Sequence, residues 1–427
     1  MSWSMQCETR SIQDVSFRRV WEGRHVFDAE LPFPSGVTFL PAAHYAAEVA
    51  SLPAELRIED CAGRPLARFA APKDEAPPFT MHLALTGRHK PAVFVTKDGK
   101  TRLAYIGAIP AGFDIRARTN LTSLAVRPGG GAGTVKATTS AGVGQADVRF
   151  VTRGRRGELF HEGGRLFFTF SARFFGSVLG VGSIDPAKPE DGVRYEGQIL
   201  FDYGDGLLRN DLAAHLFFDD EAGEWRGWAS NFSTGNDALG TRAPGGLNAV
   251  WSRECPLRGL CVMKAKTLGL SGMNEDPSGV WDAAAGKWRL LVSAFTSAGI
   301  RAQMLESDRW DGGFKPITGT VAEDSTGTTI ALAGGVWHCL AGSVDRAYYV
   351  YSYPDLKKRG KLSMSPEPWK DMKGWPHGRG WPAFAELPAG CPSKFLLLTM
   401  DRVNFPGMPT PNWTYGSLSI YTQKSQK

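Results

Sequence analysis

The chain has 427 residues, 42% apolar and 22% charged, a composition that excludes disordered and fibrous proteins. Its net charge of +6 is small and spread along the chain, whereas nucleic-acid-binding proteins concentrate Lys and Arg on one face or tail. No run of apolar residues approaches the ~18 that a membrane span needs. We therefore expect neither a nucleic-acid partner nor a membrane partner, and the sequence leaves the oligomeric state open. The 50 glycines and 27 prolines predict many turns and argue against an all-helical fold.

Cysteine spacing and the chain's start bear on the compartment. The six cysteines form neither a CxxC motif nor a zinc-ligand pattern. Only Cys255 and Cys261 are close enough to suggest a local bridge, and buried free thiols are the preferred interpretation. The first ten residues lack the basic and then apolar pattern of a secretory signal. The default expectation is a cytoplasmic protein, unless a signal was trimmed from the chain.

Residues 1–150 read as short alternating segments, which is typical of β-strands. Two of them, residues 92–95 and 102–106, flank a Lys-Asp-Gly-Lys hairpin signal at residues 97–100. An Ala-rich stretch over residues 42–50 is the one candidate helix. The glycine-rich neighbourhoods near residues 129–131 and 142–144 precede a domain boundary that we place near residue 150. We expect a β-sandwich-like domain over residues 1–150.

A repeat organises the remaining chain, residues 151–427. Residues 216–230 align without a gap on residues 279–293, with Asp, Gly, Trp, Arg and Ser coinciding. Looser copies lie at residues 159–172, 330–343 and 384–401, which makes five copies of a hairpin. Further strand-like runs lie between the copies, and no helical period separates them. The pattern predicts an all-β protein whose C-terminal domain is a five-bladed β-propeller; a β-sandwich with similar hairpins is the alternative.

The residues that precede each hairpin are candidates for the centre of the propeller, because the first strand of a blade lines the central channel. Asp211 precedes the second copy and Asp276 the third. The 63-residue offset between these copies aligns Asp211 with residue 274, two positions before Asp276. Two residues is one strand period, which predicts that both side chains point to the same face. A Glu-Asp-x-Ser/Thr-Gly pattern occurs twice, at Glu275 and again 48 residues later at Glu323 and Asp324. Carboxylates that converge in one pocket split into a proton donor and an ionised partner, as glycoside hydrolysis requires.

These blades resemble those of the five-bladed β-propeller glycoside hydrolases, the group of families 43, 32 and 68. Residues 275–282 are similar to the Arg-Asp-Pro blade motif of the fructosidases, with Glu in place of Arg. Residues 306–314 look like an outer-strand segment common to these propellers. The resemblance covers residues 158–425, and the fructosidase Glu-Cys motif is absent.

Roles for the acids follow from this resemblance. It implies Asp211 as base or nucleophile, Asp276 as the stabilising acid, and Glu323 or Asp324 as proton donor. The first-blade acid of the group has no counterpart other than Glu158. The assignment could therefore be shifted by one blade, which would make Glu275 the donor.

Aromatic and cationic residues suit sugar binding, because sugars stack on rings and accept charged hydrogen bonds. Beside Trp413 and Tyr415, the candidates for substrate binding are Arg209, Trp337, His338, Trp381 and Arg402. No cofactor is required by any motif, and a structural calcium ion is compatible with this many acids.

The sequence therefore predicts a glycoside hydrolase, an O-glycosyl hydrolase of oligo- or polysaccharides, with carboxylates in the central pocket. A non-catalytic carbohydrate-binding propeller is the first alternative. A polysaccharide lyase is the second, for which His338 or His215 could serve as base. The sugar, its linkage, and retention or inversion of configuration stay open.

Overall fold

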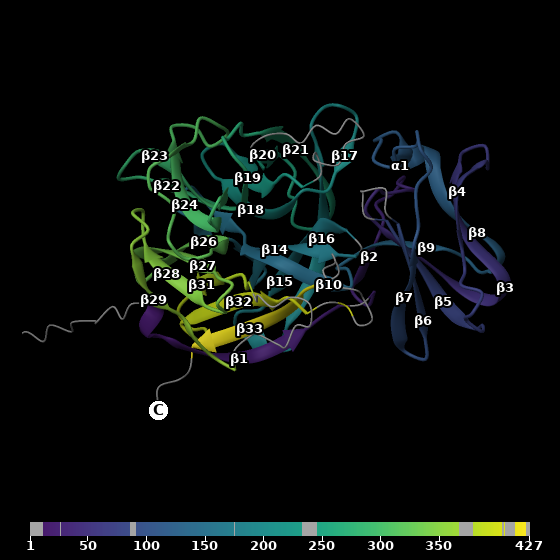
Figure 1. Cartoon of the computed structure of the whole chain (residues 1–427), viewed down its shortest axis with the longest axis horizontal. Coiled ribbons are helices and arrows are strands. Elements are labelled where there is room, and N and C mark those ends of the chain that lie inside the picture. Colours follow the sequence, from purple (N-terminus) through teal and green to yellow (C-terminus); the bar gives the residue numbers. More distant parts are fainter. Residues whose placement is uncertain are drawn as a thin grey trace, which may run out of the picture.

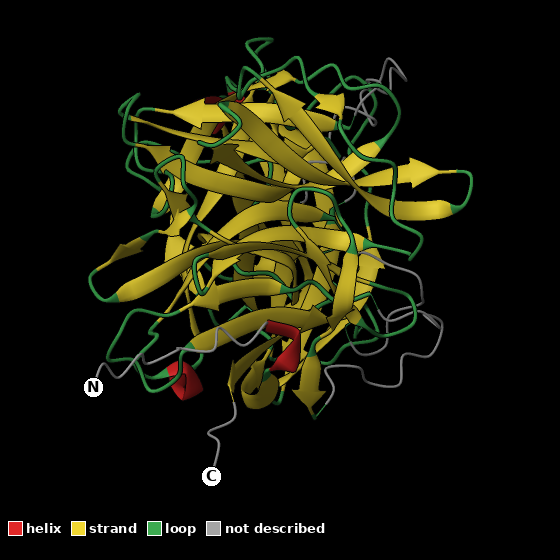
Figure 2. Cartoon of the chain, turned by 90° about the vertical axis from the view of Figure 1, so that its left-hand side faces the viewer, coloured by secondary structure: helices red, strands yellow, loops and turns green. Residues whose placement is uncertain are grey.

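The computed structural model describes residues 12–25, 27–85, 91–174, 176–232, 246–366, 379–403, 405 and 415–423. Figures 1 and 2 show a protein built almost entirely of strands, which confirms the all-β prediction. The described helical elements are the single turns η1 (Ile12–Asp14), α1 (Asn120–Ser123) and η2 (Pro189–Asp191). In the part of the chain that is described, no helix is long and apolar enough to cross a membrane.

The strands outside the N-terminal domain form five antiparallel blades of four strands each, of which the first two belong to one twelve-stranded sheet. The first blade consists of β10 (Gly144–Phe150), β14 (Arg165–Arg173), β15 (Ser177–Ile184) and β16 (Val193–Asp202). The second consists of β18 (Leu212–Asp219), β19 (Glu224–Ser230), β20 (Leu247–Ser252) and β21 (Gly259–Thr267). The third consists of β22 (Asn274–Asp282), β23 (Lys287–Thr296), β24 (Gly299–Ser307) and β25 (Lys315–Pro316). The fourth consists of β26 (Thr326–Ala333), β27 (Val336–Gly342), β28 (Tyr348–Ser352) and β29 (Lys358–Lys361).

The fifth blade joins the two ends of the chain. It contains β31 (Ala383–Glu386), β32 (Phe395–Asp401), β33 (Ser417–Gln423) and, as its outer strand, β1 (Ser16–Gly23). Figure 1 shows the purple β1 beside the yellow β33. The short β30 (Ser363–Ser365) pairs with β1 in parallel. The inner strands β10, β18, β22, β26 and β31 pack each against the next, and β31 against β10, so the ring closes as in a five-bladed propeller.

Two features of this ring concern the expected boundary at residue 150. Strand β1 lies before residue 150 and β10 ends at it, yet both pair with strands of the propeller. The predicted first hairpin copy, residues 159–172, does not contain the inner strand of its blade, which is β10. Ahead of β14 it holds only parts of the short β12 (Glu158–Leu159) and β13 (His161–Glu162). A loop insertion that carries β11 (Thr152–Arg153) separates β10 from β14, so the repeat pattern did not include β10.

Blades one and two are joined further by parallel pairing of β16 with β21, and the short β17 (Leu208–Arg209) pairs with β16.

A β-bulge recurs in the inner strands of the first four blades. Their pairing shifts register between residues 146 and 149, 212 and 215, 275 and 278, and 326 and 329. One residue in each bulge has a positive φ: Asp147, Ala213, Asp276 and Gly327. Ala213 and Asp276 are 63 residues apart, so the inferred offset between copies two and three is the structural one. From blade three to blade four the bulges are 51 residues apart, not 48.

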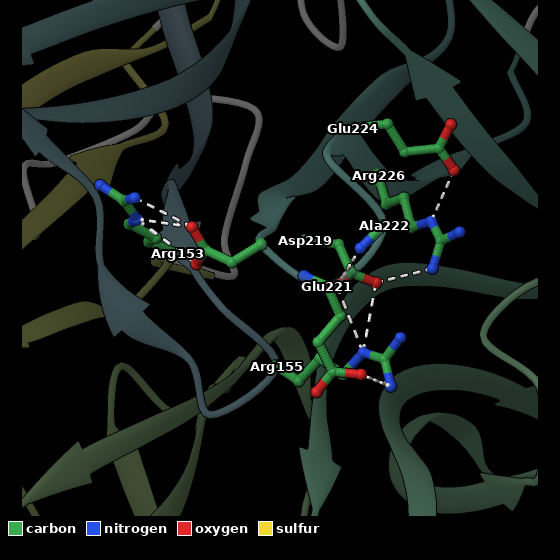
Figure 3. A network of polar contacts seen from close by, with 8 residues as sticks. Arg153, Arg155, Asp219, Glu221, Ala222, Glu224 and Arg226 are labelled. Atoms are coloured by element: carbon green, nitrogen blue, oxygen red, sulfur yellow. Dashed lines mark hydrogen bonds and ion pairs between the residues drawn. The ribbon is translucent and has the colours of Figure 1, made fainter.

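The hairpin repeat is explained by a buried turn aspartate (Figure 3). Asp219 ends β18, is 0% exposed, and its Oδ1 accepts hydrogen bonds from the backbone N–H groups of Glu221 and Ala222 at 3.1 and 3.3 Å. Its Oδ2 accepts a 2.6 Å bond from Arg226 of β19. A side-chain acceptor for turn amides is what a tight hairpin needs, and the Arg neutralises the buried charge.

The third blade repeats this turn. Asp282 accepts from the N–H groups of Ala284 and Ala285, both at 3.1 Å, and pairs with Arg289. The coinciding Asp and Arg of the repeat are therefore structural residues. Arg155, from the loop that follows β11, also binds Asp219 at 3.2 Å.

An eight-stranded sheet forms the N-terminal domain, on the right in Figure 1. Its strands are β2 (Glu30–Pro32), β3 (His44–Asp60), β4 (Pro65–Ala70), β5 (Phe79–Ala84), β6 (Ala92–Lys97), β7 (Lys100–Ile106), β8 (Leu124–Ala132) and β9 (Lys136–Ser140). The predicted hairpin at residues 97–100 joins β6 to β7. The helix expected over residues 42–50 is wrong: pairing of β3 with β5 and β9 overrides the helix propensity of its alanines. The sandwich-like form of this domain stays a prediction.

The N-terminal domain packs on the propeller through a shared core. One apolar cluster runs from Tyr45 and Phe94 in the N-terminal sheet to Phe168 in blade one and Leu398 in blade five. The Cys255 and Cys261 thiols are free; Cys261 is buried and Cys255 is exposed.

Candidate active site

Glu275 lies in β22 at the end of the ring where the inner strands begin. The pKa of its carboxyl is raised well above the ordinary value, first by desolvation and then by the negative charges of Asp276 and Asp147. The positive charges of Arg402 and Arg379 oppose this shift. Among the described residues, no side chain donates a hydrogen bond to Glu275. It is therefore a half-buried carboxyl group that favours its protonated form.

Asp147, at the bulge of β10, is the acid that sequence reasoning missed. Its Oδ2 accepts a 2.5 Å hydrogen bond from Ser171 of β14 and is also paired with the Arg173 guanidinium. Both Asp147 and Arg173 are buried. The negative charge of Asp147 lies close enough to Glu275 to raise the pKa of the Glu275 carboxyl group. The expected first-blade acid, Glu158, is exposed in β12 and lies at the other end of the channel.

A signal for Asp147 existed in the sequence. Ser171 pairs across from the residue before the bulge, as Ser230 and Ser293 do in the next two blades. Aligning the copies on this serine instead of on the turn would have led back to β10 and to Asp147.

Tyr415 connects two cations to the pair of acids. Its ring lies under the guanidinium of Arg173 at 4.1 Å and that of Arg402 at 5.1 Å. Burial raises the pKa of the Tyr415 hydroxyl. The sequence-predicted Arg402 and Tyr415 therefore do lie beside Glu275 and Asp147.

Asp211 comes just before β18 and is fully buried. Its Oδ2 accepts a hydrogen bond from Asn248 of β20 at 2.9 Å and another from the Tyr203 hydroxyl. The pKa of Tyr203 is raised by burial and by the Asp211 charge. Asp211 is thus a third acid of the same end of the ring, held in place by two donors.

Asp276 has a different environment from the one that the sequence predicted. Its Oδ2 accepts from Ser293 at 3.0 Å, Thr326 at 2.7 Å and the Gly327 N–H at 2.8 Å. Its backbone carbonyl accepts from Thr328 at 2.6 Å. The side chain therefore ties blade three to blade four, which favours a structural role over that of a stabilising acid.

Glu323 and Asp324 each lie three residues before the positions of blade four that correspond to Glu275 and Asp276, so the shared motif does not make them equivalent. Glu323 pairs with Lys358 of the outer strand β29 at 2.8 Å. Asp324 forms a bidentate pair with Arg379 at 2.9 and 2.8 Å. The structural equivalents of Glu275 and Asp276 in blade four are Thr326 and Gly327.

The other predicted binding residues divide between the two ends of the blades. Trp381 lies near the acids, packed on Gly327. Arg209 is buried and binds Asp205 at 2.7 Å. Trp337 and His338 lie at the hairpin end of β27, where Trp337 packs against Tyr353, so the structure does not bring them to Glu275. Trp413 lies outside the described residues.

His215 lies in the channel and is neutral. Its Nδ1 accepts from the Gly279 N–H at 3.0 Å, and its Nε2 lies 3.1 Å from Thr152 Oγ1. Burial, with the nearby Arg149 charge, lowers the pKa of His215 to about 3. Among the described residues, no three His, Cys, Asp or Glu side chains are grouped to hold a metal ion, and the calcium ion suggested by the sequence stays a prediction.

No protein-family model matches the chain, and no curated protein matches its sequence. Solved structures resemble the fold. The catalytic domain of a family GH62 α-L-arabinofuranosidase from Coprinopsis cinerea aligns with 66% of this chain and 91% of its own, at 11% identity and a TM-score of 0.42. An endo-1,4-β-xylanase from Bacteroides thetaiotaomicron aligns with 66% of this chain and 94% of its own, at 13% identity and a TM-score of 0.40.

A family GH43 β-1,3-galactosidase with bound galactodeoxynojirimycin gives 65% and 94% coverage, 11% identity and a TM-score of 0.42. These neighbours are glycoside hydrolases, the group that the blade motifs resemble.

Proposed function

We propose that the chain hydrolyses glycosidic bonds of oligo- or polysaccharides, with Glu275 as proton donor and Asp147 as base or nucleophile. The observation that carries this is the pairing of two carboxyl groups with opposite environments at one end of the ring. Desolvation and negative neighbours raise the pKa of Glu275, whereas Asp147 pairs with the Arg173 guanidinium and accepts a hydrogen bond from Ser171. Two such groups are the acid and base that glycoside hydrolysis needs.

In this mechanism Glu275 protonates the leaving oxygen as the bond to the anomeric carbon breaks. Asp147 either activates a water molecule or attacks the anomeric carbon itself. The negative charges of Asp147 and Asp211 stabilise the positive charge that develops on the sugar ring. These roles correspond to the shifted assignment, in which Glu275 is the donor, with Asp147 in place of Glu158 as the first-blade acid.

Two other functions have less support. A lyase would need a free histidine base, but both ring nitrogens of His215 are engaged, and His338 lies at the far end of its blade. A binding module would use the same acids as hydrogen-bond acceptors, whereas a carboxyl group whose pKa is raised by burial and negative neighbours suits a proton donor.

The test is a panel of plant and microbial oligosaccharides scored for new reducing ends, with ultraviolet absorbance followed for unsaturated lyase products. On the first substrate found, Glu275→Gln and Asp147→Asn should each lower turnover 10² to 10⁴-fold. An aryl glycoside with a good leaving group should rescue Glu275→Gln, because its departure needs little protonation.

Added azide separates the roles further, since it can replace a missing base or nucleophile. We expect azide to restore product formation in Asp147→Asn as a glycosyl azide, and not in Asp324→Asn, which serves as the matched control at a paired acid. Full turnover in both the Glu275 and Asp147 variants would refute the assignment. Sugar binding without any turnover by the unmodified protein would favour the binding module.

A further inference from the structure

A second set of polar residues faces the channel beyond the bulges. Two positions after each bulge residue, the inner strands of blades one to four place Arg149, His215, Ser278 and Thr329 in one layer. All four are buried, and all four line a cavity of about 350 Å³. None of the acids Asp147, Asp211 and Glu275 lines it.

Arg149 is a buried cation in this layer. It is 2% exposed, and its guanidinium donates to Thr329 Oγ1 at 2.7 Å and to the Asp276 carbonyl at 3.4 Å. Among the described residues no carboxylate lies within ion-pairing distance of it, and its Nε–H has no acceptor. Burial lowers the pKa of Arg149 to about 10, so it stays charged at neutral pH. The nearest acids are already engaged, Asp147 by Arg173 and Asp276 by three donors.

The neighbouring polar side chains also have donors to spare. Because His215 Nδ1 accepts from Gly279, the ring proton lies on Nε2 and is donated to Thr152 Oγ1. Within the described part of the chain, the Thr152 hydroxyl proton then has no acceptor. Ser278 Oγ accepts from the Ile330 N–H at 2.9 Å, and its own proton has no acceptor among the described residues. A buried charge is costly unless paired, and donors without acceptors call for a ligand that only accepts.

We propose that this cavity binds a small inorganic anion, which pairs with Arg149 and accepts hydrogen bonds from Thr152 and Ser278. The acids that line the cavity are compatible with this. Glu158 is exposed, and Glu386 accepts from the Gly334 N–H at 2.6 Å. The anion site is separate from the proposed hydrolase site, and a negative result for one does not bear on the other.

The experiment follows the ³⁵Cl NMR linewidth of sodium chloride in the presence of the full chain, at constant ionic strength kept by sodium gluconate. We expect saturable broadening with the unmodified protein, at least ten-fold weaker chloride binding in Arg149→Met, and binding within two-fold of normal in Arg153→Met. Arg153 is the matched control, because it lines the same cavity but is exposed and paired with Asp220 at 2.9 Å. Thr152→Val, which keeps the side-chain shape, should weaken binding three- to ten-fold and covers the case in which Arg149→Met does not fold.

Sodium phosphate added as competitor identifies the anion. Loss of broadening at phosphate concentrations below those of chloride assigns the site to an oxyanion, and persistence of the broadening assigns it to a halide. The proposal is overturned if the unmodified protein gives no saturable broadening and binds no phosphate in calorimetry. It is overturned equally if Arg149→Met folds and binds as tightly as the unmodified protein.

Discussion

The contrast between Glu275 and Asp276, two adjacent acids, is the sharpest prediction of the site. In Asp276→Ala, the donors of Ser293, Thr326 and Gly327 lose their acceptor inside the protein. The hydroxyl groups can rotate toward other acceptors, but the Gly327 N–H is fixed by the backbone. A buried donor left unsatisfied costs ~1 to 3 kcal/mol. The substitution also removes the desolvation cost of the buried carboxylate, which offsets part of this loss. We expect a loss of about 2 to 4 kcal/mol in the free energy of unfolding.

For a domain of this size, each kcal/mol lowers the melting temperature by roughly 2 °C, so the expected drop is about 4 to 8 °C. Glu275→Gln should leave the melting temperature nearly unchanged, because no described side chain donates to this carboxyl group. The pair is measured by circular dichroism melting and by turnover per folded molecule. An Asp276→Ala protein with normal melting and turnover reduced 10²-fold or more would show that Asp276 is catalytic and would refute this reasoning.

Three further outcomes are expected. The proposed donor acts when protonated, so kcat/KM should fall as the pH rises through the raised pKa of Glu275. This fall at alkaline pH should be absent from Glu275→Gln measured with an aryl glycoside, and an unchanged pH profile would exclude Glu275 as the donor. Asp219→Ala should lower the free energy of unfolding by about 3 kcal/mol, because the partly buried Arg226 guanidinium and two turn amides lose their acceptor. The exposed Asp220→Ala should change it by less than about 1 kcal/mol, and equal chemical denaturation midpoints for the two variants would contradict this. Gly327→Ala places a Cβ 2.6 Å from the Trp381 ring at a φ of +62°, so its melting temperature should fall by several degrees, and an unchanged value would show that the ring can move.

Local chemistry accounts for what the sequence predicted well. The hairpins of blades two and three were visible because Asp219 and Asp282 serve their own turns, and the amides that they bind lie two and three residues away. Such short-range patterns survive in a single sequence. Closure of the fifth blade by β1 depends on pairing between opposite ends of the chain, as between Phe17 and Gln423, and no local pattern records it.

The bulge explains why the acids were predicted less well than the hairpins. Asp211 and Asp276 would share a face only if the strand kept an unbroken period of two. At Asp276 the backbone has a φ of 61°, so the strand gains a residue and the side chain is aimed at blade four, while Asp211, ahead of its own bulge, binds Asn248. The same bulge places Asp147 with a φ of 56° beside Glu275, although nothing near Asp147 in the sequence resembles the motif around Glu275. In this ring the bulge, and not the spacing of acidic motifs, decides which carboxyl groups meet, so a search for the site has to begin from the residues that pair across each bulge.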